Sequence, residues 1–126
     1  MHVRSRLGLL ALCALTLACP EVIRTKTAFS PAAPGDPPRT LVLADGLRVV
    51  GQAGDGQRLP GGSTWKLVGA IEAGDVYKRA DGPFIIDSNN SHEAHLVVAN
   101  GRVVGFYLPG EGAFAPASQP VALPPQ

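Results

Sequence analysis

The sequence predicts an all-β protein: a small antiparallel meander, closed as a barrel or folded as a sandwich, with a disordered N-terminal tether and a disordered C-terminal tail. Short Val- and Leu-rich runs recur between turn residues, and Asn-Gly or Asp-Gly dipeptides join two pairs of these runs. After the N-terminal segment, no stretch has the periodicity of an amphipathic helix. Fifteen glycines and twelve prolines suit such a turn-rich chain.

The first eighteen residues have the layout of an export signal. Arg4 and Arg6 precede an apolar run over residues 7–18, and small or polar residues follow from Cys19. This run of about twelve residues fits the roughly 7–15 of a signal-peptide core and is shorter than the roughly 20 of a membrane-spanning helix. A buried N-terminal helix would be amphipathic, and this run is not. We expect residues 1–18 to be a signal peptide.

The positions of the two cysteines suggest what happens at the processing site. Cys13 lies within the apolar run, so loss of the signal leaves Cys19 as the single cysteine and excludes an intramolecular disulfide. A lone thiol in an oxidising compartment needs another explanation. Residues 15–19 resemble the lipobox of bacterial lipoproteins, in which a small residue, here Ala18, precedes the cysteine that becomes acylated. Thr16 departs from the pattern, because the family usually has leucine there.

The resemblance implies a cell-envelope protein that is held on the lipid bilayer through acylated Cys19. One fatty chain binds a membrane only marginally, whereas the three chains typical of such lipoproteins make release negligible. Pro20 stands where the inner-membrane retention signal of enteric bacteria has aspartate, which favours the outer membrane, facing the periplasm. Ordinary signal cleavage after Ala18, leaving a free Cys19, is the alternative.

Composition narrows the classes of partner. About 108 residues follow the signal, enough for one small domain. Without Arg4 and Arg6, nine basic residues remain against ten acidic ones. This near-neutral balance gives no electrostatic case for a nucleic-acid partner or for an anionic membrane surface.

Both ends of the mature chain are expected to lie outside the domain. Residues 19–39 read as a Pro-rich tether, because residues 30–38 are mostly proline, alanine and glycine and cannot bury enough apolar surface to become ordered. A short strand at residues 22–27 is an alternative, since the residue types suit one. Residues 116–126 are expected to be a disordered Pro-rich tail.

Residues 40–115 are expected to form the β domain. Two hairpins are predicted, one around Asp45-Gly46 and one around Asn100-Gly101, because both dipeptides tolerate the positive φ angles of a type I′ turn. The two segments resemble each other, which an internal repeat and generic hairpin chemistry explain equally well. Further strands are predicted at residues 64–72, 75–79 and 84–87.

The predicted core gathers the large apolar residues of these runs. At about 1.5–3 kcal/mol for each buried large side chain, such a set suffices for a small domain without disulfides. Its members are Leu41, Leu43, Val49, Trp65, Leu67, Ile71, Val76, Phe84, Ile86, Leu96, Val98, Val103, Phe106 and Leu108.

Residues 92–95 hold the candidate chemistry. His92, Glu93 and His95 suggest a metal site or a general base, with Asp87 or Glu111 as helpers. In an extended strand Glu93 and His95 share a face, but His92 and His95 point to opposite sides unless the segment bends. Two ligands are fewer than the three or four of a zinc site, so polar residues at a solvated strand entry are the simpler interpretation.

The sequence lacks the motifs of nucleophilic catalysis and of phosphate binding. No Gly-x-Ser-x-Gly motif is present, and the glycine cluster at residues 51–56 has no following helix that could cradle a phosphate. We therefore expect no cofactor and no enzymatic activity.

A partner surface is a further candidate. Phe106 and Tyr107 are neighbours in a predicted strand, so they face opposite sides, and one of them is either exposed or covered by a second layer. With Phe114 they suggest an apolar edge for another envelope protein. Packing back across the mouth of the barrel is the alternative. The sequence thus favours a small non-enzymatic binding or assembly module on the membrane surface, and a metal-binding or hydrolytic periplasmic protein is the second hypothesis.

Overall fold

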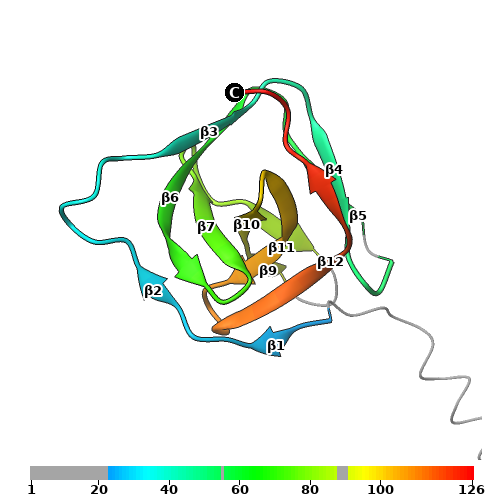
Figure 1. The fold of residues 1–126 in the computed structure, drawn as a ribbon. Coiled ribbons are helices and arrows are strands. Elements are labelled where there is room, and N and C mark those ends of the chain that lie inside the picture. Colours follow the sequence, from blue (N-terminus) through cyan, green and yellow to red (C-terminus); the bar gives the residue numbers. More distant parts are fainter. Residues whose placement is uncertain (1–22, 55, 88–90) are drawn as a thin grey trace, which may run out of the picture.

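The computed structural model describes residues 23–126 apart from residue 55 and residues 88–90. Eight strands form one antiparallel sheet that is curled into a half-barrel and does not close, and two strand pairs lie beside it (Figure 1). The all-β prediction is confirmed, whereas the expectation of a closed barrel or a sandwich is not. In this part of the chain no helix is long and apolar enough to cross a membrane.

The strands of the main sheet follow one another in an order that differs from the order in the chain. From one edge to the other they are β1 (Thr25–Lys26), β12 (Ala113–Ala122), β11 (Arg102–Leu108), β10 (His95–Ala99), β7 (Gly74–Arg79), β6 (Ser63–Ile71) and β2 (Ser30–Pro31), and β3 (Thr40–Leu43) also pairs with β6. The small sheets are β4 (Leu47–Val50) with β5 (Gly56–Leu59), and β8 (Ile85–Asp87) with β9 (Ser91–Glu93).

The predicted turn at Asn100-Gly101 is confirmed. β10 and β11 pair up to Ala99 and Arg102, and the two turn residues have φ angles of 54° and 73°. Positive φ at both positions defines the type I′ turn, whose twist suits a two-residue hairpin.

The hairpin predicted at Asp45-Gly46 is wrong. Leu41 of β3 pairs with Trp65, while Val49 of β4 pairs with Gln57 across the β4–β5 hairpin. Neither Asp45 nor Gly46 has the positive φ that a type I′ turn requires. Since only one of the two similar segments is a hairpin, their likeness reflects composition and not a repeated structure.

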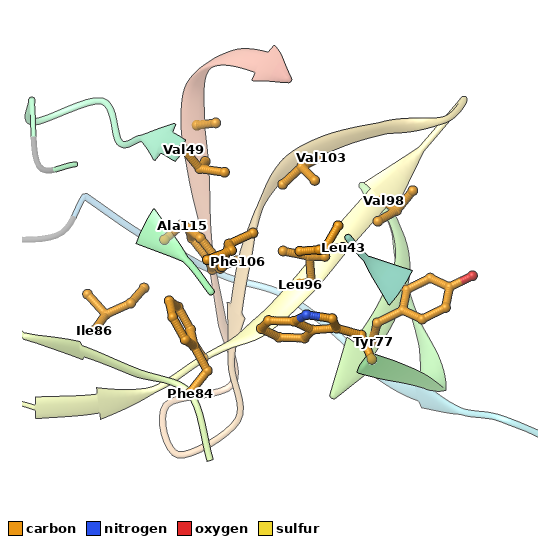
Figure 2. Close-up of a cluster of buried hydrophobic side chains, with 14 of the residues drawn as sticks. Leu43, Val49, Tyr77, Phe84, Ile86, Leu96, Val98, Val103, Phe106 and Ala115 are labelled. Atoms are coloured by element: carbon orange, nitrogen blue, oxygen red, sulfur yellow. The ribbon is translucent and has the colours of Figure 1, made fainter. Parts of the chain in front are cut away.

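The inner face of the half-barrel holds the main core, in which aromatic rings pack among aliphatic side chains (Figure 2). Trp65 meets Phe84 edge-on with 5.6 Å between ring centroids, and Phe84 stacks on Phe106 at 5.9 Å. The indole N–H of Trp65 donates to the Ser63 hydroxyl at 2.9 Å. All fourteen predicted core residues are buried except Leu67, which is half-buried. Leu59, Tyr77, Ala94, Val97 and Tyr107 are also buried.

The outer face of the sheet carries a second, smaller cluster. Ile71, Val76, Val97 and Tyr107 form it. Residues 24–31, here called the strap, cross this face from β12 at one edge to β6 at the other (Figure 1). Within the strap, the ring of Phe29 stacks on that of Tyr107 with 5.2 Å between centroids.

The tether expected at residues 19–39 is therefore wrong for the strap. β1 pairs with β12 and β2 pairs with β6, so this segment belongs to the sheet, and the alternative strand at residues 22–27 is borne out at Thr25–Lys26. The strap lies so close to β6 that a Cβ on Gly69 would come within 2.4 Å of both Phe29 and the Ser30 carbonyl. Only glycine fits at that approach.

The disordered tail expected at residues 116–126 is also wrong. β12 runs to Ala122, with Pro116 opposite Gly105 and Val121 opposite Val103. On the β11 side, residues 117–120 consequently lie opposite Val104 and form a bulge, and Ala117 bridges to Gly51. Proline is tolerated in strands at bulges and at open edges, which explains how this Pro-rich segment pairs.

Candidate functional site

The candidate histidines lie where the chain passes from a small sheet into the main sheet. His92 of β9 pairs with Ile86 of β8, whereas His95 begins β10. Between these strands Ala94 is fully buried, and its N–H donates to the Phe84 carbonyl at 2.8 Å. The change of sheet at Ala94 assigns the two histidines to different sheets.

His95 is paired with Glu93, as the shared face of an extended segment predicts. Nε2 of His95 lies 2.9 Å from Oε2 of Glu93, and because an ionised carboxylate only accepts, the imidazole is the donor. Nδ1 of the same ring is buried and has no partner among the described residues. The ring also lies beside Tyr107, 6.4 Å between centroids. This histidine is held inside the sheet and is poorly placed to meet a substrate.

His92 contacts Glu111 in the turn after β11. Its Nδ1 lies 2.7 Å from Oε2 of Glu111, although that oxygen accepts no hydrogen bond of good geometry from the described residues. Arg24 donates from Nε to the other carboxylate oxygen, and Lys26 donates from Nζ to the Glu111 carbonyl at 2.9 Å. Glu111 therefore fastens the start of the strap and is shared between a histidine and an arginine.

A shallow groove of about 630 Å³ opens between the β9 segment and this turn. It is lined by Arg24, Ser91, His92, Glu93, Leu108, Pro109, Gly110 and Glu111. Arg24 offsets one carboxylate charge at Glu111, while Glu111 and Glu93 also contact His92 and His95. The polar side chains around the groove are therefore engaged with one another.

The two acid–histidine pairs do not converge on a metal centre. Within the described residues, no three His, Cys, Asp or Glu side chains group closely enough to hold a metal ion, and zinc sites take three or four protein ligands. Asp87 pairs through its backbone with Ser91, and its side chain lies outside the described part of the structure. Of the predicted site residues, Glu93 meets His95 and Glu111 meets His92.

The expected partner surface of Phe106, Tyr107 and Phe114 is mostly covered. Phe106 is 4% exposed in the inner core, and Tyr107 is 7% exposed on the other face, beneath Phe29. Phe114 is half-buried against the same outer cluster. Phe106 and Tyr107 do face opposite sides, but the strap covers the second side. The exposed partner surface is therefore wrong for these two residues, and the expectation that a second layer covers one of them is confirmed by the strap over Tyr107.

Cys19, the predicted lipid-attachment residue, lies outside the described residues. The signal peptide and the lipid anchor accordingly stay predictions. The structure does fix Arg24, five residues further along the chain, through its ion pair with Glu111.

Sequence reasoning missed three contacts that join distant parts of the chain. Arg24 binds Glu111, Phe29 stacks on Tyr107, and the side-chain amide of Gln126 binds the backbone of Val42. No local motif marks any of them, because each depends on which strands become neighbours. Only the isolated large ring of Phe29, within a polar and Pro-rich segment, gave a signal that could have been followed.

Comparisons with known proteins add no function. No family model matches the chain, and no curated protein or solved structure matches it significantly. The functional argument therefore rests on the residues described above.

Proposed function

We propose that this protein is a bacterial envelope lipoprotein whose β domain is held at the membrane surface by acylated Cys19 and acts as a non-enzymatic binding or assembly module. The order of the chain supports the proposal: an apolar run, then Ala18-Cys19, then a β domain. Metal or hydrolytic chemistry at His92, Glu93 and His95 has less support, since these residues divide into two pairs.

The observation that carries the proposal is how soon the folded domain begins. Arg24 is already fixed to Glu111, and an extended chain spans at most about 3.6 Å per residue, so Cys19 lies within about 18 Å of Arg24. A tether of twenty residues would have held the domain several nanometres away. With the strap packed on the sheet, an anchor at Cys19 keeps the domain next to the lipid headgroups.

The short connection also favours one orientation on the membrane. Ile23 lines a small hollow together with Gly51 and Gln52, which places the tip of the β4–β5 hairpin beside the anchored end. On this hairpin Arg48 and Arg58 are exposed and lie directly opposite each other. Like charges in such a pair repel, and anionic headgroups would offset that repulsion, at about 1 kcal/mol for each arginine near the surface.

Fractionation of cells that carry Cys19→Ser tests the anchor. We expect the wild type in the membrane fraction with labelled palmitate attached, and the variant unlabelled in the soluble periplasmic fraction. Ser118→Ala, a change of similar size at an exposed serine of β12, should leave both results unchanged. A Cys19→Ser protein that stays membrane-bound, or a wild type that takes up no palmitate, would overturn the proposal.

Fluorescence quenching on vesicles tests the orientation. In the acylated protein an introduced cysteine is the only free thiol, so Gln52→Cys and Arg102→Cys can each take one dye. Gln52 lies at the tip of the β4–β5 hairpin, whereas Arg102 lies at the opposite end of β11 from the start of the strap. A headgroup-attached quencher should quench the first dye several-fold more than the second. Equal quenching would reject this orientation and leave the anchor standing.

A further inference from the structure

The outer edge of β3 pairs with no other strand of the described residues. β3 pairs with β6 along one side only, and in an antiparallel pair alternate residues direct their N–H and C=O groups to the partner. The Arg39 carbonyl accepts from Leu67 N–H, and the Leu43 carbonyl accepts from Gly62 N–H. The odd-numbered residues of β3 therefore face β6, and Thr40 and Val42 direct their backbone groups outward.

At Val42 a side chain takes the place of a neighbouring strand. Val42 N–H donates to Oε1 of Gln126 at 2.8 Å, and Nε2 of Gln126 donates back to the Val42 carbonyl at 3.1 Å. Nε2 also donates to the Pro124 carbonyl at 2.9 Å, which holds the amide in position. A primary amide carries the same donor and acceptor as a peptide group. Gln126 thus satisfies the edge at one residue and shows that it accepts an amide partner.

We propose that the outer edge of β3 is a strand-addition site for a second copy of this chain, and that Gln126 is the intramolecular competitor that holds it closed. An antiparallel pair with its two-fold axis at Val42 sets Thr40 opposite Ala44 of the copy and Leu41 opposite Leu43. Val42 is 45% exposed, one of the few large apolar side chains left at the surface, and the same valine of the copy would cover it.

Charge favours this self-pairing. The register that centres on Val42 brings Arg39 opposite Asp45 of the copy, and residues 40–44 carry no charge that would repel. Edge strands without inward charges are the usual site of such pairing, and a two-fold interface closes on itself, so the product is a dimer and not a filament. The inference goes beyond the proposed function and does not need the lipid anchor.

Sedimentation of residues 19–126 with Cys19→Ser tests the site without lipid, since every described contact lies within that range. Gln126→Ala removes two hydrogen bonds that compete with the dimer, so its dimer dissociation constant should fall about threefold to tenfold relative to the parent. Gln119→Ala, at another exposed glutamine of the C-terminal segment, should leave it unchanged.

Two substitutions at Val42 decide which surface is used. Val42→Pro removes an outward N–H and none of the β6 ladder, and Val42→Lys sets like charges opposite each other at the two-fold axis. Each should abolish dimers in the Gln126→Ala background. If Val42→Pro fails to fold, Val42→Lys alone carries the test. A Gln126→Ala protein that stays monomeric throughout the concentration series, or one that dimerises despite Val42→Lys, would overturn the proposal.

Discussion

The two faces of the main sheet are closed in different ways. The inner face packs around Trp65 of β6, Phe106 of β11 and Phe84, which directly precedes β8. The outer face is closed by one short strap whose main contact is the ring of Phe29 on Tyr107. The comparison shows that a segment with the composition of a flexible tether can become part of a fold. Here the strap pairs with β12 and β6 and covers the ring of Tyr107.

This difference also connects the fold to the proposed function. A free segment up to residue 39 would let the domain explore the space above a membrane, whereas the strap ties Arg24 to Glu111 and leaves four residues between Cys19 and Arg24. Whatever loosens the strap should therefore change both the stability of the domain and its distance from the proposed anchor at Cys19.

The largest effect is expected on the inner face. Trp65 is fully buried against Phe84, and its indole N–H is bound to Ser63. Trp65→Ala should lower the free energy of unfolding by about 3–5 kcal/mol, because it leaves a cavity that the half-barrel cannot fill. Urea denaturation measures this value. Trp65→Phe keeps most of the ring and should cost less, and a Trp65→Ala protein with the stability of the parent would mean that the inner face is not the main core.

Substitutions on the outer face should lower the stability less, and the effects of two of them should depend on each other. Phe29 is half-buried, so Phe29→Ala should cost about 1–3 kcal/mol, below the range for a fully buried phenylalanine. Gly69→Ala drives a methyl group into the Phe29 ring and the Ser30 carbonyl and should loosen the same strap. Because both changes act on one contact, the double variant should lose less than the sum of the two losses.

Amide exchange of the strap is the matching local measurement. Exchange at Thr27, whose N–H donates to the Gly112 carbonyl at 3.0 Å, should quicken in both single variants, while exchange in β10 stays slow. Ile23→Ala, at an exposed position before the strap, is the control and should change little. Additive losses of stability in the double variant would show that Gly69 and Phe29 are not in contact. The strap would then not lie against β6 in solution.

A smaller loss of stability is expected at the Asn100-Gly101 turn, which sets the register of β10 and β11 and so determines which of their residues face the inner side of the sheet. Gly101 has φ 73° and open space around its Cβ position, whereas Gly35 has equal space and no positive φ. Gly101→Ala should therefore cost about 1 kcal/mol from backbone strain alone. Gly35→Ala should be neutral or slightly stabilising. Equal denaturation midpoints for the two variants would argue that residues 100–101 do not hold a type I′ turn in solution.

The sequence predicted most of the inner face because its signals are local. Val98, Val103 and Phe106 stand at alternating or bulge-corrected positions beside an Asn-Gly turn, and each is buried as expected. The Asp45-Gly46 turn failed although its local signal was almost as strong. There β3 gains more from pairing with the long strand β6, a choice made by the tertiary structure and invisible in the dipeptide.

The outer face and the candidate site were predicted poorly because they depend on distant partners. Pro116 signalled a tail, but it lies next to a bulge of β12 where proline is tolerated. The pairing of Glu93 with His95 followed from the two-residue period of a strand. The pairing of His92 with Glu111 and Arg24 did not, since it requires the turn after β11 and the strap to meet beside β9.

The smallest effect is expected at the polar end of the strap. The Arg24 and Glu111 side chains are 32% and 30% exposed, so solvent screens their ion pair and its contribution should be at most about 1 kcal/mol. Arg24→Ala and Glu111→Gln should each lower the unfolding free energy by about that amount or less, and the loss should shrink in high salt.

Arg39→Ala, whose 3.4 Å pair with Asp75 is more exposed, is the matched control and should cost less. A double-mutant cycle isolates the coupling between Arg24 and Glu111. Zero coupling at low salt would mean that Phe29 and the two short strands alone hold the strap, and that the domain can swing further from Cys19 than five residues allow.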